Sequence, residues 1–313
     1  MMANRPNLVF VFPDEFRLHA LGCLGQDPTL TPNLDRFAAE GLLLTHCVSN
    51  YPVCSPYRAM LLTGKYPHAN GVLGNCNSET AQYGAFLSET EVCLSDVLHA
   101  AGYSCGYIGK WHLDPPSEQV EFTEGPRKNG VVWDSYTPPG PRRHGFDFWY
   151  SYGCCDWHFQ PHYWTGDAPI EARIDVRAWS ARHETDVAIA YLRNEGGAYR
   201  DPDQPFALIV SHNPPHMPFD QVPAEYVARY GDRTSADLLN RPNVDYDGAG
   251  GEVARKHGKN YFAAVTGVDE QFGRLLRAIE DEGLRENTIV VFTSDHGEMM
   301  GSHGLYGKNV WYD

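Results

Sequence analysis

The stretch "NLVFVFPDE" (residues 7–15) joins a short apolar run to two acidic side chains. Three later runs have the same apolar character: "YSCGYIG" (103–109), "FALIVSH" (206–212) and "TIVVFTS" (288–294). Short runs of this kind are typical of strands buried on both faces, as in parallel sheets covered by helices. The four runs therefore predict the central strands of one sheet.

Helical patterns lie between these runs. They cover residues 31–41, 89–102, 177–196 and 251–283, and each ends at a glycine. Glycine commonly follows the last turn of a helix because it adopts the left-handed conformation without strain. Strands that alternate with helices predict an α/β fold, a doubly wound, mostly parallel sheet with helices on both faces.

The middle of the chain, residues 114–170, departs from this alternation. It is rich in Pro, Gly, Trp, Tyr and His, as in "YTPPGPRRHGFDFWYSYGCCDWHFQPHYW". We expect a long, self-packed excursion over the active-site edge, where substrate specificity is often built. Its aromatic side chains suit either stacking on a substrate or packing onto the sheet.

Composition narrows the class of protein. The formal charge of −15 argues against a nucleic-acid partner, and a hydrophobic content of 42% indicates a folded core. No apolar run approaches the roughly 18 residues of a membrane span. The apolar core near the start, Leu8 to Phe12, is too short for a signal peptide, so we expect a cytoplasmic or periplasmic protein. Eight cysteines without a C-x-x-C pair are expected to be mostly reduced, buried thiols.

Polar side chains follow all four predicted strands. In chain order they are Asp14 and Glu15, Lys110 and His112, His212 and His216, and Asp295 and His296. The carboxyl ends of parallel strands meet at one edge of a sheet, where ligands bind. Like charges about 4 Å apart repel by roughly 4 kcal/mol near a protein surface, so three carboxylates here favour a bound cation. Oxygen ligands with one imidazole suit Ca²⁺ or Mg²⁺. Together with Arg58, Lys110 and Lys308, the bound metal would form a positively charged site for a tetrahedral oxyanion such as sulfate or phosphate.

A cysteine stands where another helix is predicted to begin. In "VCSPYRAMLLTG" Ser55 can cap the helix and Pro56 can lead it, which places Cys54 at its N-terminus. That position lowers the pKa of a thiol. By these residues alone, Cys54 is either a buried structural thiol or a reactive group.

The run Cys54-Ser55-Pro56-Tyr57-Arg58, followed by Leu62-Thr63-Gly64, resembles the signature of the type I sulfatases. The resemblance implies an alkaline-phosphatase-like fold and oxidation of Cys54 to formylglycine by a formylglycine-generating enzyme. Tyr57 departs from the serine usual in that signature. The first strand and "TSDHGEMMGSHG" resemble the family's two metal-binding blocks. They imply a Ca²⁺ site, with Mg²⁺ or Mn²⁺ as alternatives, formed by Asp14, Glu15, Asp295, His296 and the modified Cys54.

Other blocks extend the resemblance along the chain. "GYIGKWH" implies catalytic roles for Lys110 and His112, "HNPPHMPF" for His216 and "LYGKNVWYD" for Lys308, while Arg58 would fix the formylglycine. Asn75 in "HANGVLGN" stands where some relatives carry a substrate-binding asparagine. Members of the family continue beyond the Lys308 block into a smaller C-terminal subdomain. We therefore expect residues 1–313 to be one catalytic domain, truncated at its C-terminus.

The activity implied by the resemblance is hydrolysis of a sulfate ester to an alcohol and inorganic sulfate. The substrate would be a sulfated small molecule or carbohydrate, with no nucleic-acid or membrane partner. Two alternatives stay open: a phosphonate monoester or phosphodiester hydrolase of the same superfamily, or a non-catalytic anion-binding protein in which Cys54 stays a thiol. A two-zinc phosphodiesterase is disfavoured because the chain lacks a convincing Asp-x-x-x-His ligand set.

Overall fold

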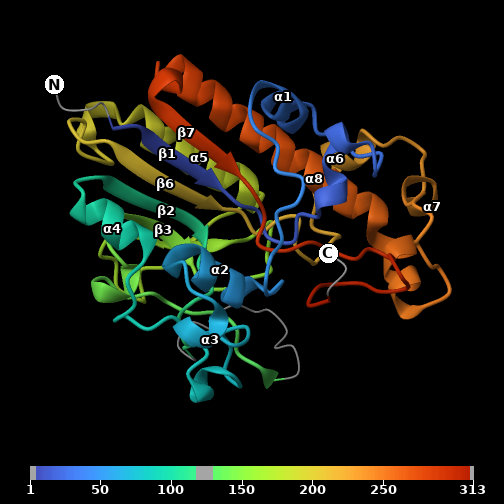
Figure 1. Cartoon of the computed structure of the whole chain (residues 1–313), viewed down its shortest axis with the longest axis horizontal. Coiled ribbons are helices and arrows are strands. Elements are labelled where there is room, and N and C mark those ends of the chain that lie inside the picture. Colours follow the sequence, from blue (N-terminus) through green and yellow to red (C-terminus); the bar gives the residue numbers. More distant parts are fainter. Residues whose placement is uncertain (1–4, 118–129, 311–313) are drawn as a thin grey trace.

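A computed structural model describes residues 5–117 and 130–310 of this chain. Its sheet has seven strands in the order β5-β4-β3-β2-β6-β1-β7 (Figure 1). Their bounds are β1 Asn7–Val11, β2 Ser104–Lys110, β3 Phe148–Tyr152, β4 His162–Thr165, β5 Ile174–Asp175, β6 Phe206–Ser211 and β7 Thr288–Phe292. The four predicted strands are confirmed as β1, β2, β6 and β7.

The register of the parallel strands aligns their carboxyl ends. Val11 of β1 pairs with Val210 of β6 and with Phe292 of β7, and Val210 pairs with Ile108 of β2. Because these four residues form one row, the polar residues just beyond them emerge at one edge of the sheet. The register of the strands therefore determines where on the sheet the site forms.

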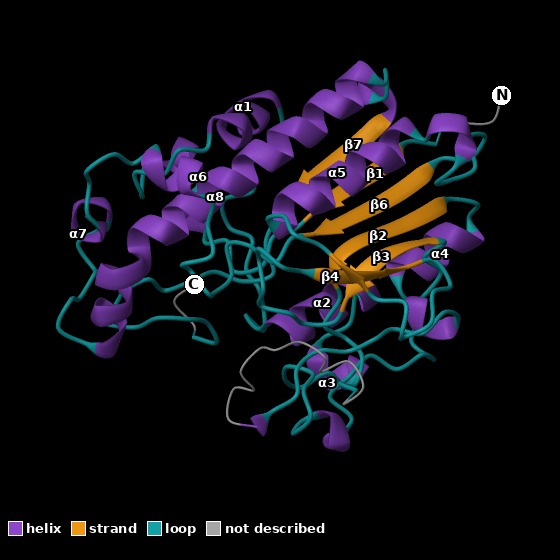
Figure 2. Cartoon of the chain, turned by 180° about the vertical axis from the view of Figure 1, so that it is seen from behind, coloured by secondary structure: helices purple, strands orange, loops and turns teal. Residues whose placement is uncertain are grey.

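Helices cover both faces of the sheet, but not equally. Their bounds are α1 Pro32–Glu40, α2 Cys54–Thr63, α3 Pro67–Asn70, α4 Leu94–Ala100, α5 Ser180–Arg193, α6 Ala224–Ala228, α7 Ser235–Leu238 and α8 Ala249–Asp281. Helices α5 and α8 cross one face, the front of Figure 2, and α2 and α4 lie against the other. Successive side chains of β1 point to opposite faces of the sheet, so β1 packs against both helix layers. Val9 and Val11 are buried towards α8, and Leu8 and Phe10 point towards α2 and α4.

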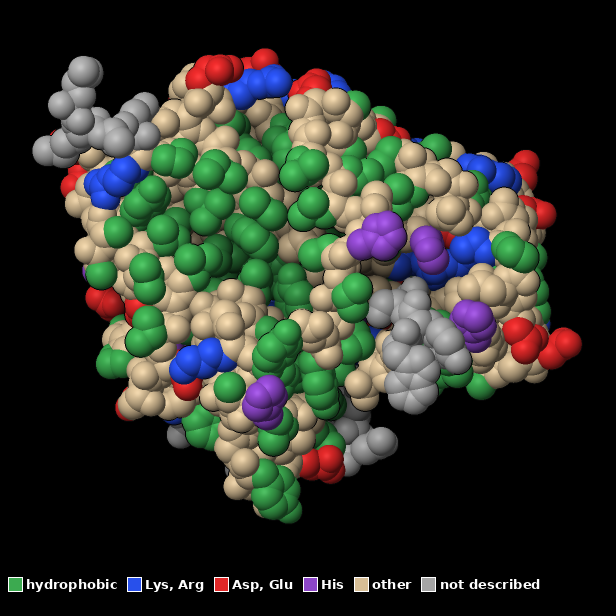
Figure 3. Space-filling view, in the orientation of Figure 1, with side chains coloured by type: hydrophobic (Ala, Val, Ile, Leu, Met, Phe, Trp, Pro, Cys, Tyr) green, Lys and Arg blue, Asp and Glu red, His purple; other side chains and the backbone are tan. Residues whose placement is uncertain are grey.

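The face beside α2 and α4 is the less covered of the two. Leu8 and Phe10 are only half-buried, and Ile289 of β7 is 53% exposed. Hydrophobic side chains gather over this face in the space-filling view (Figure 3). The prediction of helices on both faces is confirmed, although among the described residues the second layer is incomplete.

The excursion contributes to the sheet itself, which its sequence did not predict. Strand β3 is parallel to β2, and β4 is antiparallel to β3, so this part of the chain extends the sheet at one side. Residues 118–129, within the same range, lie outside the described residues. No helix of residues 5–117 and 130–310 is long and apolar enough to cross a bilayer.

Candidate active site

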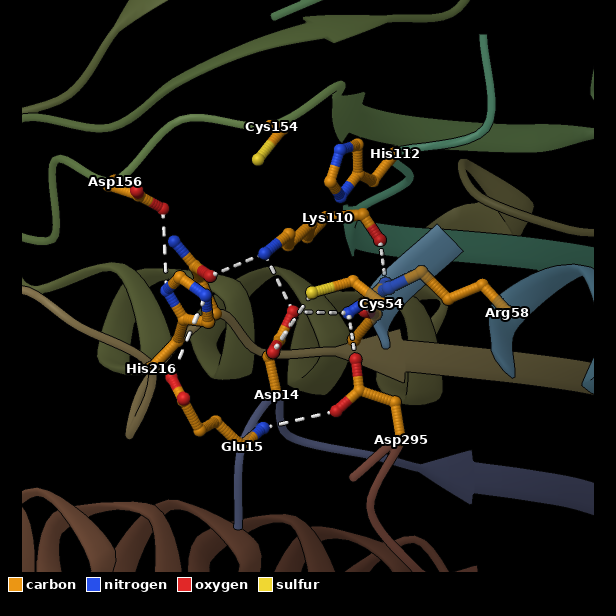
Figure 4. Close-up of polar contacts among 12 residues, drawn as sticks. Asp14, Glu15, Cys54, Arg58, Lys110, His112, Cys154, Asp156, His216 and Asp295 are labelled. Atoms are coloured by element: carbon orange, nitrogen blue, oxygen red, sulfur yellow. Dashed lines mark hydrogen bonds and ion pairs between the residues drawn. The ribbon is translucent and has the colours of Figure 1, made fainter. Parts of the chain in front are cut away.

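The predicted site residues converge at the carboxyl edge of the sheet, beside the first turn of α2 (Figure 4). Asp14 and Glu15 follow β1, Lys110 ends β2, and Asp295 follows β7. All are buried, as are Cys54 and Arg58 of α2. The structure thus brings together side chains that three separate strands and a helix supply.

Four of these residues form a compact group of possible metal ligands. Asp14, Cys54, Asp295 and His296 each offer one ligand atom, and these atoms all lie within 4.8 Å of one another. Burial, together with the charge of Asp14, raises the pKa of Asp295 to about 6. Two buried carboxylates with an imidazole fit a divalent cation such as Ca²⁺, because the ion would offset their repulsion.

Helix α2 begins two residues earlier than its sequence predicted. Cys54 is its first residue and Val53 its N-cap, which has no side-chain capping bond. Ser55 is therefore not the cap: its hydroxyl donates to the His112 carbonyl over 2.7 Å and accepts from the Cys76 amide over 3.0 Å. These bonds tie the first turn of α2 to the segment after β2.

The Cys54 thiol lies in strongly positive surroundings. Its sulfur is 3.0 Å from Lys308 Nζ, 3.3 Å from His296 Nε2 and 3.6 Å from Asp14 Oδ1. Burial and Asp14 oppose ionisation, but Lys110, Lys308 and His296 outweigh them and hold the pKa of Cys54 well below its ordinary value. Position 54 therefore favours an anionic group.

Arg58 lies one helical turn after Cys54 and links Asp14 and Asp295, the aspartates of the two predicted metal-binding blocks. Its Nη2 is 3.0 Å from Asp14 Oδ2 and 3.2 Å from Asp295 Oδ2. Its Nη1 donates to the Lys110 carbonyl and to the Ser211 hydroxyl. The planar guanidinium thus joins the ends of all four central strands, one of the strongest arrangements open to a buried cation.

Lys110 is a second fully buried cation at the site. Its Nζ is 2.6 Å from Asp14 Oδ2 and 3.1 Å from Asn213 Oδ1. Burial would lower the pKa of Lys110, but Asp14 raises it well above its ordinary value. The residue before Lys110 in β2 has to be glycine, since Gly109 has φ +99° and an added Cβ would lie 2.1 Å from the Ser211 carbonyl oxygen.

His216 and Lys308 form the side of the site farther from β2. Lys308 Nζ is 2.9 Å from His216 Nε2, and the His216 Nδ1 is 2.7 Å from the Met217 carbonyl oxygen and 3.5 Å from Asp156 Oδ1. Burial and Lys308 oppose protonation of His216, while Glu15 and Asp14 favour it, and the net effect raises its pKa. His212, by contrast, pairs with Glu184 over 2.7 Å, away from this group.

Comparison with known proteins agrees with this geometry. The family model described as Sulfatase matches residues 6–313. The chain belongs to the sulfatase family. It is 43% identical to an endo-4-O-sulfatase of Bacteroides thetaiotaomicron, covering 96% of this chain and 60% of that relative. It is 35% identical to an ulvan-active sulfatase of Formosa agariphila, covering 99% of this chain and 54% of the relative.

Solved structures show the sulfatase fold as well. A Bacteroides fragilis protein described as a sulfatase superposes with a TM-score of 0.89 at 45% identity, over 97% of this chain and 64% of that one. This sulfatase chain therefore spans a little over half the length of the curated relatives it matches. The fold predicted from the strand pattern and the family predicted from the Cys54 signature are both confirmed.

Glu15 does not lie where a metal ligand was expected in this sulfatase. Its backbone, with φ +66°, turns the side chain away from the ligand group of Asp14, Cys54, Asp295 and His296. The Glu15 carboxylate instead accepts from the Met217 amide and lies 3.6 Å from His216 Nε2 (Figure 4). Only its backbone amide reaches the group, donating to Asp295 Oδ1 over 3.0 Å.

Asn75, predicted to bind substrate, has a contact within the protein. Its Oδ1 accepts from the Ser55 amide over 3.1 Å, so it serves the first turn of α2 as a side-chain cap does. The structure gives no contact of Asn75 with the ligand group. His112, in contrast, lies at the site with its Nε2 3.1 Å from the Cys76 carbonyl oxygen, and burial lowers its pKa.

Three contributors to the site were not predicted. Ser211 and Asn213 hold Arg58 and Lys110, and Asp156 faces His216. Ser211 and Asn213 flank His212 at the end of β6, so their place in the sequence could have drawn attention to them. Asp156 belongs to the excursion and had no such signal.

Proposed function

We propose that this protein hydrolyses a sulfate ester of a carbohydrate, releasing the alcohol and inorganic sulfate. The observation that carries the proposal is the placement of Cys54 between the Lys308 ammonium and a group of buried ligands for a divalent cation. The names of the relatives, an endo-4-O-sulfatase and an ulvan-active sulfatase, support sulfate as the group and a carbohydrate as its carrier.

A divalent cation and a formylglycine would complete the site. A divalent cation held by Asp14, Asp295, His296 and residue 54 would supply Lewis acidity towards a sulfate oxygen. Formylglycine at position 54 would supply a geminal diol, one hydroxyl to attack sulfur and the other to expel sulfate afterwards. The positive surroundings of Cys54 suit such a nucleophile because they favour its anionic form.

Lys110 is suited to hold a sulfate oxygen. Its ammonium carries three hydrogens, and Asp14 and Asn213 accept two of them. The third can be donated to the substrate without loss of the other contacts. A preorganised donor of this kind stabilises charge that develops in the transition state.

His216 and Lys308 are placed to serve the leaving group. The Met217 carbonyl engages the Nδ1 of His216, which leaves Nε2 directed at Lys308. A proton shared between Nε2 and the ammonium can pass to the departing alkoxide oxygen. General acid catalysis of this kind contributes roughly 10²- to 10⁴-fold.

His112 is suited to the opposite task, accepting a proton. Burial lowers its pKa, as does the nearby Lys110 charge, so the imidazole is neutral near pH 7. Its backbone has φ +55°, a conformation uncommon for residues other than glycine, which indicates that the surrounding structure holds it in place. A neutral imidazole beside residue 54 can take the proton of the second hydroxyl.

The proposal is tested in two stages. The chain is expressed with a formylglycine-generating enzyme, and the peptide that spans Cys54 is analysed by mass spectrometry for the aldehyde. The protein is then assayed on 4-O-sulfated oligosaccharides, an aryl sulfate and an aryl phosphodiester. A peptide that always retains the thiol would refute the catalytic account, and faster cleavage of the phosphodiester would replace the sulfatase activity with that of a phosphodiester hydrolase.

A further inference from the structure

A second group of possible metal ligands lies in the aromatic-rich excursion, separate from the group around Cys54. It consists of Asp134, Cys155 and His162, whose ligand atoms all lie within 4.8 Å of one another. The three residues are 6%, 8% and 1% exposed. A carboxylate, a thiol and an imidazole thus meet inside the protein.

The chain is shaped to bring these residues together. Cys155 follows β3 and His162 begins β4, while Asp134 comes from the segment packed against Gly153. A Cβ on Gly153 would lie only 2.4 Å from the Ser135 amide nitrogen, so this close approach requires glycine.

Hydrogen bonds orient Asp134 towards the other two residues. Its Oδ1 accepts from the amides of Ser135 and Cys154, each over 2.9 Å. Its Oδ2 lies 2.7 Å from His162 Nε2. Backbone donors therefore hold one carboxylate oxygen and direct the other at the imidazole, and hydrogen bonds of this kind orient metal ligands in proteins.

The balance of charge in this group favours a divalent cation. A Cys155 thiolate would be buried beside the Asp134 carboxylate, so it would need a compensating positive charge. One carboxylate, one thiolate and a neutral imidazole bring a charge of −2, which an ion of charge +2 cancels. The mixed O, S and N donors suit Zn²⁺, whereas Ca²⁺ and Mg²⁺ disfavour a thiolate ligand.

We propose that Asp134, Cys155 and His162 bind a zinc ion, with a fourth position for water. Binding would release the thiol proton of Cys155, and His162 would bind as the neutral imidazole. The ion would fix the position of Cys155 and, through Asn213, that of Lys110 in the candidate active site. Asn213 donates to the Cys155 carbonyl over 2.8 Å and also accepts from Lys110. This zinc site does not depend on the activity proposed above.

The proposal is tested with the Cys54→Ser protein, so that the thiol at position 54 cannot contribute a signal. The protein is treated with chelator and titrated with Co²⁺, which gives a near-ultraviolet charge-transfer band when a thiolate binds it. We expect one equivalent of Co²⁺ to produce this band and excess Ca²⁺ not to remove it. We also expect about one zinc per chain in the wild-type protein by elemental analysis.

Two further variants assign the signal. The adjacent Cys154→Ser should keep the band, since serine preserves the amide that binds Asp134, and Cys155→Ser should abolish it. If Cys155→Ser fails to fold, a Cys93→Ser change in the Cys54→Ser protein removes the other thiol-containing group, Cys93, Asp96 and His144, and the band should persist. Absence of the band in that protein, its persistence in the Cys155→Ser variant, or its loss in Cys154→Ser would each overturn the proposal.

Discussion

The Lys308 ammonium lies 3.0 Å from the Cys54 sulfur, although 254 positions separate the two residues in the chain. Lys308 belongs to the segment after β7, which returns past the carboxyl edge of the sheet to meet the first turn of α2 (Figure 1). The same ammonium contacts His216 and His296. One side chain thus contacts the proposed nucleophile position, a predicted metal ligand and the proposed acid.

Replacing Lys308 should impair departure of the alcohol more than binding of the sulfate. We expect Lys308→Ala to lower kcat by roughly 10²-fold or more on a sugar sulfate, whose alkoxide needs a proton. The loss should be much smaller on an aryl sulfate, whose phenolate leaves unaided. Steady-state kinetics on both substrates measure the difference, with Lys256→Ala, an exposed lysine on α8, as the control. Equal losses on the two substrates would assign Lys308 to sulfate binding instead.

Arg58 should matter for stability as much as for activity. Arg58→Ala leaves the buried carboxylates of Asp14 and Asp295 without their shared partner, which we expect to cost about 3–5 kcal/mol of unfolding free energy. Arg58→Lys should also destabilise, since an ammonium cannot span all four of the guanidinium's partners. Denaturant unfolding without added metal provides the measurement. An unchanged midpoint in both variants would show that the ion pairs are not needed for the fold.

Binding of a cation to the ligand group of Asp14, Cys54, Asp295 and His296 should weaken at low pH. The pKa of Asp295 is raised to about 6, so below that pH a cation must displace a proton to bind. The Ca²⁺ affinity should therefore be highest above pH 6 and fall by up to about tenfold per pH unit below it, if one proton is displaced. Calorimetric titration between pH 5 and 8 would show this trend, and an affinity independent of pH would contradict it.

The raised pKa of Asp295 also determines how the stability of the metal-free protein changes with pH. Because the folded-state pKa of Asp295 lies above its unfolded value, its stabilising contribution is complete below about pH 4 and is lost as the pH rises through 6. Added Ca²⁺ should restore stability at pH 7 but not at pH 4. In Asp295→Asn, the restoration at pH 7 should be much reduced.

Asn75 allows a structural role to be separated from substrate binding. If it only serves the Ser55 amide, Asn75→Ala should lower stability by about 1 kcal/mol and leave KM unchanged. Asn75→Asp keeps the acceptor and should retain most of the stability. A raised KM at normal stability would instead support the substrate-binding role that the resemblance implies.

The sequence was most informative where local pattern and chemistry coincide. Apolar runs such as Leu8 to Val11 can form little other than buried strands, and the polar residues after them could only gather at one edge once the strands were parallel. The strands of the excursion were missed because its many Pro and Gly residues, which disfavour strands, lie among the strand-favouring Tyr and Trp residues. Strand β3 is defined by its pairing with β2, which no local pattern specifies.

By itself, the sequence determined the doubly wound sheet and the edge at which the site lies, and it singled out Cys54 as the proposed nucleophile position. Tertiary structure decided which of the neighbouring polar groups take part. It directs Glu15 towards His216 and Asn75 towards the Ser55 amide, and it brings Asn213 and Asp156 to the site. The reason is physical: spacing along the chain sets which edge a residue reaches, whereas backbone dihedrals and distant packing set which way its side chain points.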